Sequence, residues 1–429
     1  MKKRLSRALA LLLVTFAFLG GLRVYRAFAA NDRDKDDSGY TSITTLARAM
    51  QLIRQDYVDE SKISYEDLTH AALRGMLNSL DPHSQFMDQR DFKGMEDDAN
   101  SRFEGLGVIV TQREGNLVIV NPIENSPGMR AGLLPGDQIF KIDGQSTEKM
   151  DLNDAIDKLR GEAGEKITLT ILRPSTHEVK DYTMVRENVT VASVKDARML
   201  PAEIAGEFKI GYARITEFSK PTASELAKKL DELEKAGMQA FILDLRFNPG
   251  GLLDSAVDVS GLFLPPKTVV VSTEGRVPSQ SHVYPTSESA KPHPHYPMAV
   301  LINSGSASGA EIVAGALKDL NRAILVGETT FGKGSVQSVI QLQDGSAVRL
   351  TTAKYYTPSK KVIHEHGVAP TVHVTLTPEQ ERMLILSRRD DLSTDAEKRE
   401  VANFRDTQLE RAADALRGVM VYAEKNSPK

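Results

Sequence analysis

Ser308 and Lys333 are the two residues whose types and surroundings suggest chemistry. Ser308 follows an apolar run at 298–302 and precedes a helix-like run at 311–320. Its hydroxyl is therefore expected at a strand-to-helix turn, beside the positive end of a helix dipole. Lys333 lies between two glycines, and burial there would remove its charge and let the amine take the serine proton. The pair predicts a nucleophilic serine that needs no histidine. A serine that caps a helix and a solvated lysine is the alternative.

A second motif, Asn248-Pro249-Gly250-Gly251, follows an expected buried strand at 240–246 that contains Asp244 and Arg246. Glycines allow backbone N–H groups to point into a site without obstruction by a side chain. Each such donor stabilises a developing oxyanion by about 3 kcal/mol. The N–H groups of Gly250, Gly251 and Gly309 are therefore candidate oxyanion donors. An ordinary Pro-Gly turn is the alternative interpretation of the motif.

Length, charge and cysteine content limit the class of protein. The 429 residues exceed one ordinary domain. The segment 1–30 carries six positive and no negative charges around an uncharged stretch at 8–22, which is typical of a secretory signal peptide, with an uncleaved anchor as the alternative. Residues 31–429 have a net charge of −10, which argues against a nucleic-acid partner. The absence of cysteine excludes disulfides and thiolate chemistry.

Hydrophobic periodicity divides the chain into segments. Apolar spacing of three and four predicts helices near both ends, and short apolar runs with glycine-rich turns predict a compact β-rich region. Beyond it, strands alternate with helices, which indicates a mixed α/β core. The expected segments are a signal peptide or anchor at 1–30, a linker and helical segment at 31–97, a β-rich domain at 98–185, an α/β core at 186–376 and a helical segment at 377–429.

Taken together, five motifs resemble those of the carboxyl-terminal processing (tail-specific) peptidases, serine endopeptidases with a PDZ domain and a Ser-Lys dyad. The similarity spans roughly residues 40–375. Besides the β-rich segment, it comprises the motifs Leu80-Asp81-Pro82-His83-Ser84, Asp244-Leu245-Arg246-Phe247-Asn248-Pro249-Gly250-Gly251, Ser306-Ala307-Ser308-Gly309-Ala310-Glu311-Ile312 and Phe331-Gly332-Lys333-Gly334-Ser335-Val336-Gln337.

The resemblance implies specific roles in the site. It makes Ser308, rather than Ser304 or Ser306, the nucleophile, Lys333 the general base 25 residues later, and Gln337 the residue that orients the lysine. The chain departs from the family pattern in having Gly309-Ala310 after the nucleophile, where Ala-Ser is usual, and Phe247 where a polar residue is usual. Neither departure removes a catalytic side chain.

The segment 98–185 resembles a PDZ domain. Its loop 103–108 is similar to a carboxylate-binding loop, whose backbone N–H groups capture the end of a peptide chain. The predicted peptide-binding residues are Gly105, Leu106, Gly107, Val108, Ile156 and Leu159. Arg160 is a candidate for coupling this domain to the core, although an exposed cation at a helix C-terminus is the simpler interpretation. A β-rich adaptor that binds nothing is the alternative for the whole domain.

The expected protein is an exported serine endopeptidase that recognises the C-terminal tails of protein substrates and cleaves them. It is expected in the bacterial periplasm or on the outer face of the cytoplasmic membrane, as a homodimer, with a regulatory partner protein and without a cofactor. One alternative is a catalytically silent PDZ scaffold that binds such tails. Another pairs Ser308 with His83 or His364 as the base.

Other polar residues are given structural roles. His293-Pro294-His295 and His364-Glu365-His366 lack a third ligand in register, so no metal site is expected. His83 is expected to help join the N-terminal helical segment to the core. Asp258 and Glu311 lie near the site in sequence, and Glu311 is interpreted as a first-turn acid that satisfies the helix dipole rather than as a catalytic acid.

Overall fold

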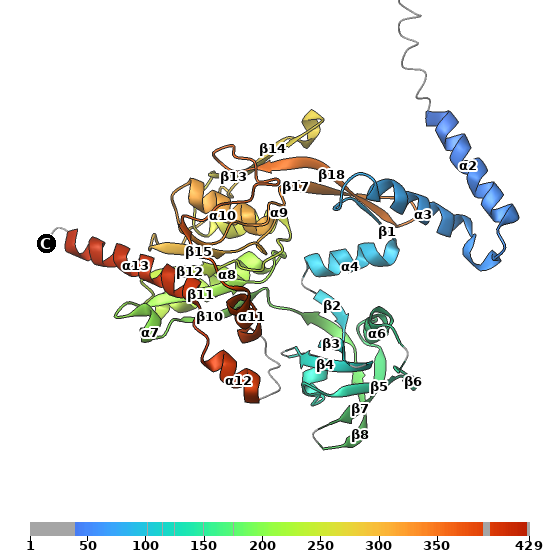
Figure 1. The fold of residues 1–429 in the computed structure, drawn as a ribbon, viewed down its shortest axis with the longest axis horizontal. Coiled ribbons are helices and arrows are strands. Elements are labelled where there is room, and N and C mark those ends of the chain that lie inside the picture. The colour runs from blue at the N-terminus through green and yellow to red at the C-terminus, as the bar shows by residue number, and fades with distance from the viewer. Residues whose placement is uncertain are drawn as a thin grey trace, which may run out of the picture. The chain divides into compact units, whose positions relative to one another are not determined.

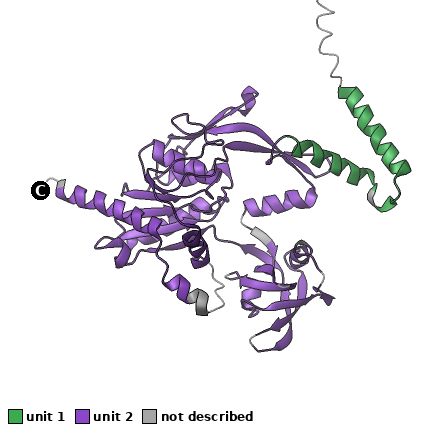
Figure 2. Ribbon diagram, in the orientation of Figure 1, with its two compact units in different colours: residues 1–80 green, residues 81–429 purple. Residues whose placement is uncertain are grey.

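The computed structural model describes residues 39–100, 102–113, 115–123, 125–148, 150–174, 176–388 and 395–426. The predicted signal peptide or anchor at 1–30 lies outside them. The chain divides into two compact units, residues 1–80 and 81–429 (Figure 2). No helix among the described residues is both long and apolar enough to cross a membrane.

The first unit is helical, as the apolar spacing predicts. It contains α2 (Gly39–Asp56), the short 3-10 helix η2 (Glu60–Lys62) and α3 (Tyr65–Asn78). Ser64 caps α3, because its side chain accepts a hydrogen bond from Asp67 N–H. None of the residues of α2 is buried, so its apolar side chains are exposed.

The core of the second unit is a six-stranded sheet, mostly parallel, in the order β10 (Val194–Met199), β11 (Ile210–Ile215), β12 (Ala240–Asp244), β15 (Met298–Ile302), β16 (Ile324–Gly327) and β19 (Val372–His373). Only β10 runs antiparallel to its neighbour. Every residue of β12 and β15 is buried, because a parallel sheet is covered by helices on both faces.

Helices cover both faces of this sheet (Figure 1). Phe241 and Leu243 of β12 pack in the same apolar cluster as α8 (Thr222–Lys235), α9 (Leu253–Gly261) and α10 (Gly309–Asp319). Ile242, between them, belongs to a second cluster with α7 (Ala202–Ala205) and α13 (Thr407–Asn426). The alternation along β12 therefore assigns the helices to opposite faces.

A second, antiparallel sheet lies beside the core. Its order is β1 (Gln85–Met87), β18 (Ala347–Tyr356), β13 (Val269–Gly275) and β14 (His282–Pro285), and β17 (Ser335–Gln341) also pairs with β18. Asp81 connects the segment before β1 to this sheet, because its carboxylate accepts hydrogen bonds from Ser84 Oγ and Thr351 Oγ1. A 3-10 turn, η3 (Pro278–Gln280), precedes β14.

The β-rich region has its own sheet and core. Its strands are β3 (Val108–Arg113), β4 (Asn116–Pro122), β5 (Gln138–Ile142), β6 (Gln145–Ser146), β7 (Lys166–Arg173) and β8 (Glu178–Val185), with helices α5 (Pro127–Arg130) and α6 (Leu152–Leu159). Before and after it, β2 (Arg102–Gly105) pairs with β9 (Glu187–Thr190), next to α4 (Gln89–Ala99). The C-terminal segment adds α11 (Pro378–Ser387) and α12 (Asp395–Ala402) before α13. The predicted mixed α/β fold with a β-rich insertion and flanking helices is confirmed. The domain boundaries stay predictions.

Candidate active site

Ser308 occupies a strained turn between β15 and α10. Its φ is 52°, in the left-handed region that a residue with a side chain rarely adopts. Gly250 packs against this turn so closely that a Cβ on Gly250 would lie 2.6 Å from Ser308 Cβ. A glycine is therefore required at 250. The turn leaves Ser308 half-buried, at the N-terminus of a helix whose dipole favours negative charge.

Glu311 joins the turn of Ser308 to the loop of Lys333. It is fully buried, and one carboxylate oxygen accepts hydrogen bonds from the N–H groups of Ser308 (2.8 Å) and Lys333 (2.9 Å). The other oxygen accepts from Gly332 N–H (2.7 Å) and Thr330 Oγ1 (2.5 Å). Burial raises the pKa of Glu311, and these hydrogen bonds oppose the rise.

This role of Glu311 was not predicted from the sequence, where the residue was interpreted only as a first-turn acid of the helix. The position of an acid three residues after Ser308 was visible in the sequence, but its contact with a loop 22 residues away was not.

Lys333 and Ser308 line the same cavity, which has a volume of about 660 Å³. Lys333 is half-buried, and its pKa is lowered mainly by burial and then by the positive charge of Arg349, while Glu311 opposes the change. Among the described residues, no hydrogen bond joins Ser308 Oγ to Lys333 Nζ. The structure thus brings the two side chains to one cavity, and their catalytic roles stay a prediction.

Gln337 lines the same cavity from β17. Its amide nitrogen donates hydrogen bonds to Ser335 Oγ (2.9 Å) and Thr351 Oγ1 (3.3 Å). These bonds fix the orientation of the amide and leave its oxygen free to accept a hydrogen bond from an amine. The arrangement suits the predicted role of orienting the lysine.

The candidate oxyanion donors differ in availability. Gly250 N–H donates to Asn248 Oδ1 at 2.8 Å, so this donor is already used within its own turn. Within the described part of the chain, no hydrogen bond is donated by the N–H of Gly251 or Gly309. These two N–H groups remain as candidate donors. A Cβ on residue 250 would lie 2.8 Å from Gly309 N, so the glycine at 250 keeps the space in front of that N–H open.

A buried ionic network holds the turn that carries these glycines. Arg246 is almost fully buried and forms ion pairs with Asp244 (2.7 Å) and Asp406 (2.7 Å). Arg388 adds a third bond, to Asp244 at 2.6 Å. The two arginines hold the pKa of Asp244 far below its usual range despite the opposing effect of its burial. Segments from the C-terminal end of the chain therefore anchor the strand that leads into the turn.

A separate cavity of about 330 Å³ lies on the β-rich domain. The residues that line it include all six predicted peptide-binding positions: Gly105, Leu106, Gly107, Val108, Ile156 and Leu159. Leu106 also packs in the domain core, with only 1% of its surface exposed. Arg160 lies at the edge of this cavity, and its charge lowers the pKa of Asp98, which burial raises more strongly.

Comparisons with known proteins identify the family. The model of peptidase family S41 matches residues 209–374, a PDZ domain model matches 118–173, and the model of the activating protease CtpB N-terminal domain matches 23–91. The carboxy-terminal-processing protease of Bartonella bacilliformis is 39% identical over 348 residues, which cover 80% of this chain and 77% of the relative. The carboxy-terminal processing protease CtpA of Bacillus subtilis is 37% identical, covering 79% and 70%. The chain belongs to peptidase family S41.

The resemblance predicted from five motifs is thereby confirmed, and this S41 chain is a carboxy-terminal processing serine protease with a PDZ domain. A solved structure from Bacteroides fragilis, described as an S41 protease, superposes with a TM-score of 0.51 at 19% identity. It covers 86% of this chain and 97% of the other, and it shows the likeness of the fold alone.

The histidines do not enter the cavity of this S41 site. Neither His83 nor His364 lines it. The pKa of His83 is lowered by burial and then by the positive charge of Lys333. Asp258 does line the cavity, and burial followed by the charge of Asp254 raises its pKa. Four carboxylates contribute to the wall of the cavity: Asp98, Glu217, Asp254 and Asp258.

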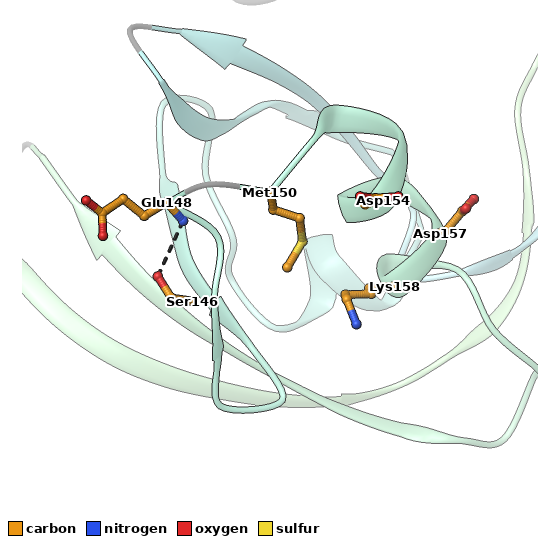
Figure 3. A pocket seen from close by; sticks show the side chains of 6 residues that line it. All are labelled: Ser146, Glu148, Met150, Asp154, Asp157 and Lys158. Atoms are coloured by element: carbon orange, nitrogen blue, oxygen red, sulfur yellow. Dashed lines mark hydrogen bonds between the residues drawn. The ribbon is translucent and has the colours of Figure 1, made fainter. Parts of the chain in front are cut away.

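A further hollow on the PDZ domain, of about 570 Å³, is lined by Ser146, Glu148, Met150, Asp154, Asp157 and Lys158 (Figure 3). In Figure 3 the carboxylates of Glu148 and Asp157 extend away from each other, and the dashed line is the bond from Glu148 N–H to Ser146 Oγ, 3.3 Å. Its charged groups do not converge on one point. This hollow therefore offers no group of converging side chains comparable to the cavity lined by the loop at 105–108.

Proposed function

We propose that Ser308 is the nucleophile of this protease and that Lys333 is its general base. The observation that carries the proposal is that one buried carboxylate, Glu311, binds the backbone of both residues while their side chains line one cavity. Two loops held by the same group keep a constant separation, which proton transfer requires.

The neutral Lys333 amine takes the proton of Ser308 Oγ as that oxygen attacks the scissile carbonyl. The N–H groups of Gly251 and Gly309 stabilise the negative charge on the carbonyl oxygen. The Lys333 ammonium then protonates the leaving amine, which departs with the C-terminal fragment. Water attacks the acyl-enzyme, with Lys333 again as base, and this step releases the remainder of the substrate.

The PDZ cavity is proposed to select the substrates. Backbone N–H groups of the loop at 105–108 bind the terminal carboxylate, and Ile156 and Leu159 contact an apolar final side chain. Arg160 connects tail binding to the active-site cavity through Asp98. The alternative of a catalytically silent scaffold would retain the same tail binding without the chemistry.

Export, dimerisation and regulation are further parts of the proposal. The basic and apolar sequence at 1–30 supports delivery to the periplasm or to the outer face of the cytoplasmic membrane. Exposed apolar side chains along α2, among them Ile43, Leu46 and Ile53, support a homodimer through this helix. A regulatory partner protein stays an expectation from the family resemblance.

The deciding experiment measures cleavage of one peptide with a free or an amidated C-terminus by the wild type, Ser308→Ala and Lys333→Ala. Only the wild type should cleave, and it should prefer the free carboxylate. Hydrolysis retained by Lys333→Ala would support a histidine base. Equal cleavage of the two peptides would contradict terminal capture, and binding without cleavage by the wild type would favour the scaffold.

A further inference from the structure

Two carboxylates on α8 meet a histidine from a distant segment. Asp231 and Glu234 are three residues apart, so they lie on the same face of the helix. His293 comes from the segment between β14 and β15, and its Nδ1 lies 2.9 Å from Glu234 Oε1. One ligand atom from each of the three residues lies within 4.8 Å of those of the other two.

An unpartnered buried hydroxyl lies next to this group. Tyr296 exposes only 8% of its surface, and its hydroxyl has no hydrogen-bond partner among the described residues. Burial, followed by the negative charge of Glu234, raises the pKa of Tyr296, which places the hydroxyl close to that carboxylate. A buried hydroxyl without a partner is costly, so a hydrogen bond to Glu234 or to a water held by a ligand at this group would stabilise it.

We propose that Asp231, Glu234 and His293 form a binding site for a divalent cation of the zinc type. One imidazole nitrogen and two carboxylate oxygens are a donor set that Zn²⁺ accepts, at about 2.0–2.2 Å from the metal. A water molecule completes the four ligands and hydrogen-bonds to the Tyr296 hydroxyl. No metal site was expected from the sequence because the pair His293 and His295 lacks a third ligand in register; α8 places two carboxylates near His293.

The surroundings leave these ligands available for a cation. Asp231 is exposed and forms no ion pair with another described residue. Its carboxylate, which lies within 4.8 Å of the other two ligand atoms, can therefore rotate to the spacing of a tetrahedral site. Arg322, which packs on the Tyr296 ring, donates to the carbonyls of Phe263 and Tyr296 instead of pairing with Glu234. The site lies near the C-terminal end of α8, where the helix dipole also favours a cation.

The proposed cation would stabilise the fold and take no part in hydrolysis. None of its three ligands lines the cavity of Ser308. It would join α8 to the segment that leads directly into β15, the strand before the nucleophile turn. The competing account is a plain hydrogen bond between His293 and Glu234, which needs no metal.

The test is calorimetric titration of the purified, metal-free protein with ZnCl₂, and with CaCl₂ for comparison. The wild type should bind one Zn²⁺ per chain and bind Ca²⁺ more weakly. His293→Ala and Asp231→Asn should weaken Zn²⁺ binding at least about tenfold. Asp231 is exposed, so Asp231→Asn should not disturb the fold. It therefore tests the site even if His293→Ala does not fold. His295→Ala removes the same side chain from an exposed position outside the group and should bind as the wild type does.

Two further measurements complete the test. Saturating Zn²⁺ should raise the Tm of the wild type and of His295→Ala by several degrees, and not that of His293→Ala. Peptide hydrolysis should be unchanged by chelation. The proposal is wrong if the wild type binds no Zn²⁺ saturably, if His295→Ala loses as much affinity as His293→Ala, or if chelation abolishes hydrolysis.

Discussion

At the scale of single residues, two opposite charges act on Lys333. Arg349 lowers the pKa of Lys333 and Glu311 raises it, in addition to the larger effect of burial. The proposed general base must be neutral, so activity should rise as the pH rises through the pKa of Lys333. Arg349 and Glu311 should therefore shift the acidic limb of the pH–rate profile in opposite directions, Arg349 to lower pH and Glu311 to higher pH.

Arg349→Gln should move that limb to higher pH. The substitution removes a positive charge that disfavours the ammonium, so the pKa of Lys333 rises toward its ordinary value. We expect a shift of about half a pH unit or more in the profile of kcat/KM. Arg349→Lys keeps the charge and should leave the limb in place; a shift of the same size in both variants would mean that the charge is not responsible.

Glu311→Gln should move the limb the other way. Loss of the ionised carboxylate removes a charge that favours the ammonium, so the pKa of Lys333 falls and the limb shifts to lower pH. The NH₂ group of the glutamine also faces a backbone N–H that donates to the carboxylate in the wild type. Two donors then face each other, and that hydrogen bond is lost. The turn of Ser308 and the loop of Lys333 are then held less tightly to each other. We expect kcat at the optimum to fall by roughly 10- to 100-fold with a smaller change in KM. A normal kcat with an unshifted limb would contradict the role of Glu311.

The sequence predicts the site residues better than their connections. Ser308, Lys333 and Gln337 were predicted because each lies in a local motif whose residue types and order are informative, and the three side chains line one cavity. Glu311 was identified only as a helix acid, because its second set of bonds depends on the tertiary proximity of another loop. Gly250 was expected to donate to an oxyanion, but the side-chain conformation of Asn248, which the sequence does not reveal, occupies that N–H.

At the scale of elements, the C-terminal segment supports the turn at 245–251. Asp406, just before α13, binds Arg246 through two parallel hydrogen bonds of 2.9 and 2.7 Å. Arg246 is buried, so removing one of its partners leaves an incompletely compensated charge in the interior. The helical tail is therefore a structural part of the catalytic core.

Asp406→Asn should accordingly destabilise the core by about 2–4 kcal/mol and lower its thermal unfolding transition. The same substitution at Asp414 is the matched control, because its ion pair with Arg417 in α13 is exposed and should contribute less than about 0.5 kcal/mol. Equal effects of the two substitutions, measured by thermal unfolding, would show that the Arg246 network does not stabilise the turn.

Elements differ in how well the sequence predicts them. The buried strands β12 and β15 were expected, because continuous apolar runs bounded by turn residues are typical of a covered parallel sheet. The pairing of β2 with β9, and of β1 with β18, was not expected. Each pairing joins segments far apart in the sequence and involves a strand of only three or four residues, over which period-2 patterning carries too little information.

At the scale of the whole second unit, charged residues connect the PDZ cavity with the active-site cavity. Arg160 lines the first and Asp98, on α4, lines the second. The charge of Arg160 lowers the pKa of Asp98, and the charge of Asp98 in turn raises the pKa of Glu217, after the larger effect of burial on each carboxyl. Tail binding beside Arg160 can therefore alter the electrostatics of the cavity that contains Ser308.

A double-mutant cycle tests this connection. Arg160→Gln and Asp98→Asn should each lower kcat/KM for a peptide with a free C-terminus, and the double variant should differ from additivity by about 1 kcal/mol, since neighbouring charges interact. The amidated peptide lacks the terminal carboxylate that the PDZ cavity is proposed to bind, and it should show additivity. Arg90 and Asp157 form an exposed ion pair that also joins α4 to α6, and the same cycle there should give a coupling near zero. If both cycles gave equal coupling, or if the amidated peptide showed it too, general contact between α4 and α6 would explain the effect, and communication through Asp98 would be excluded.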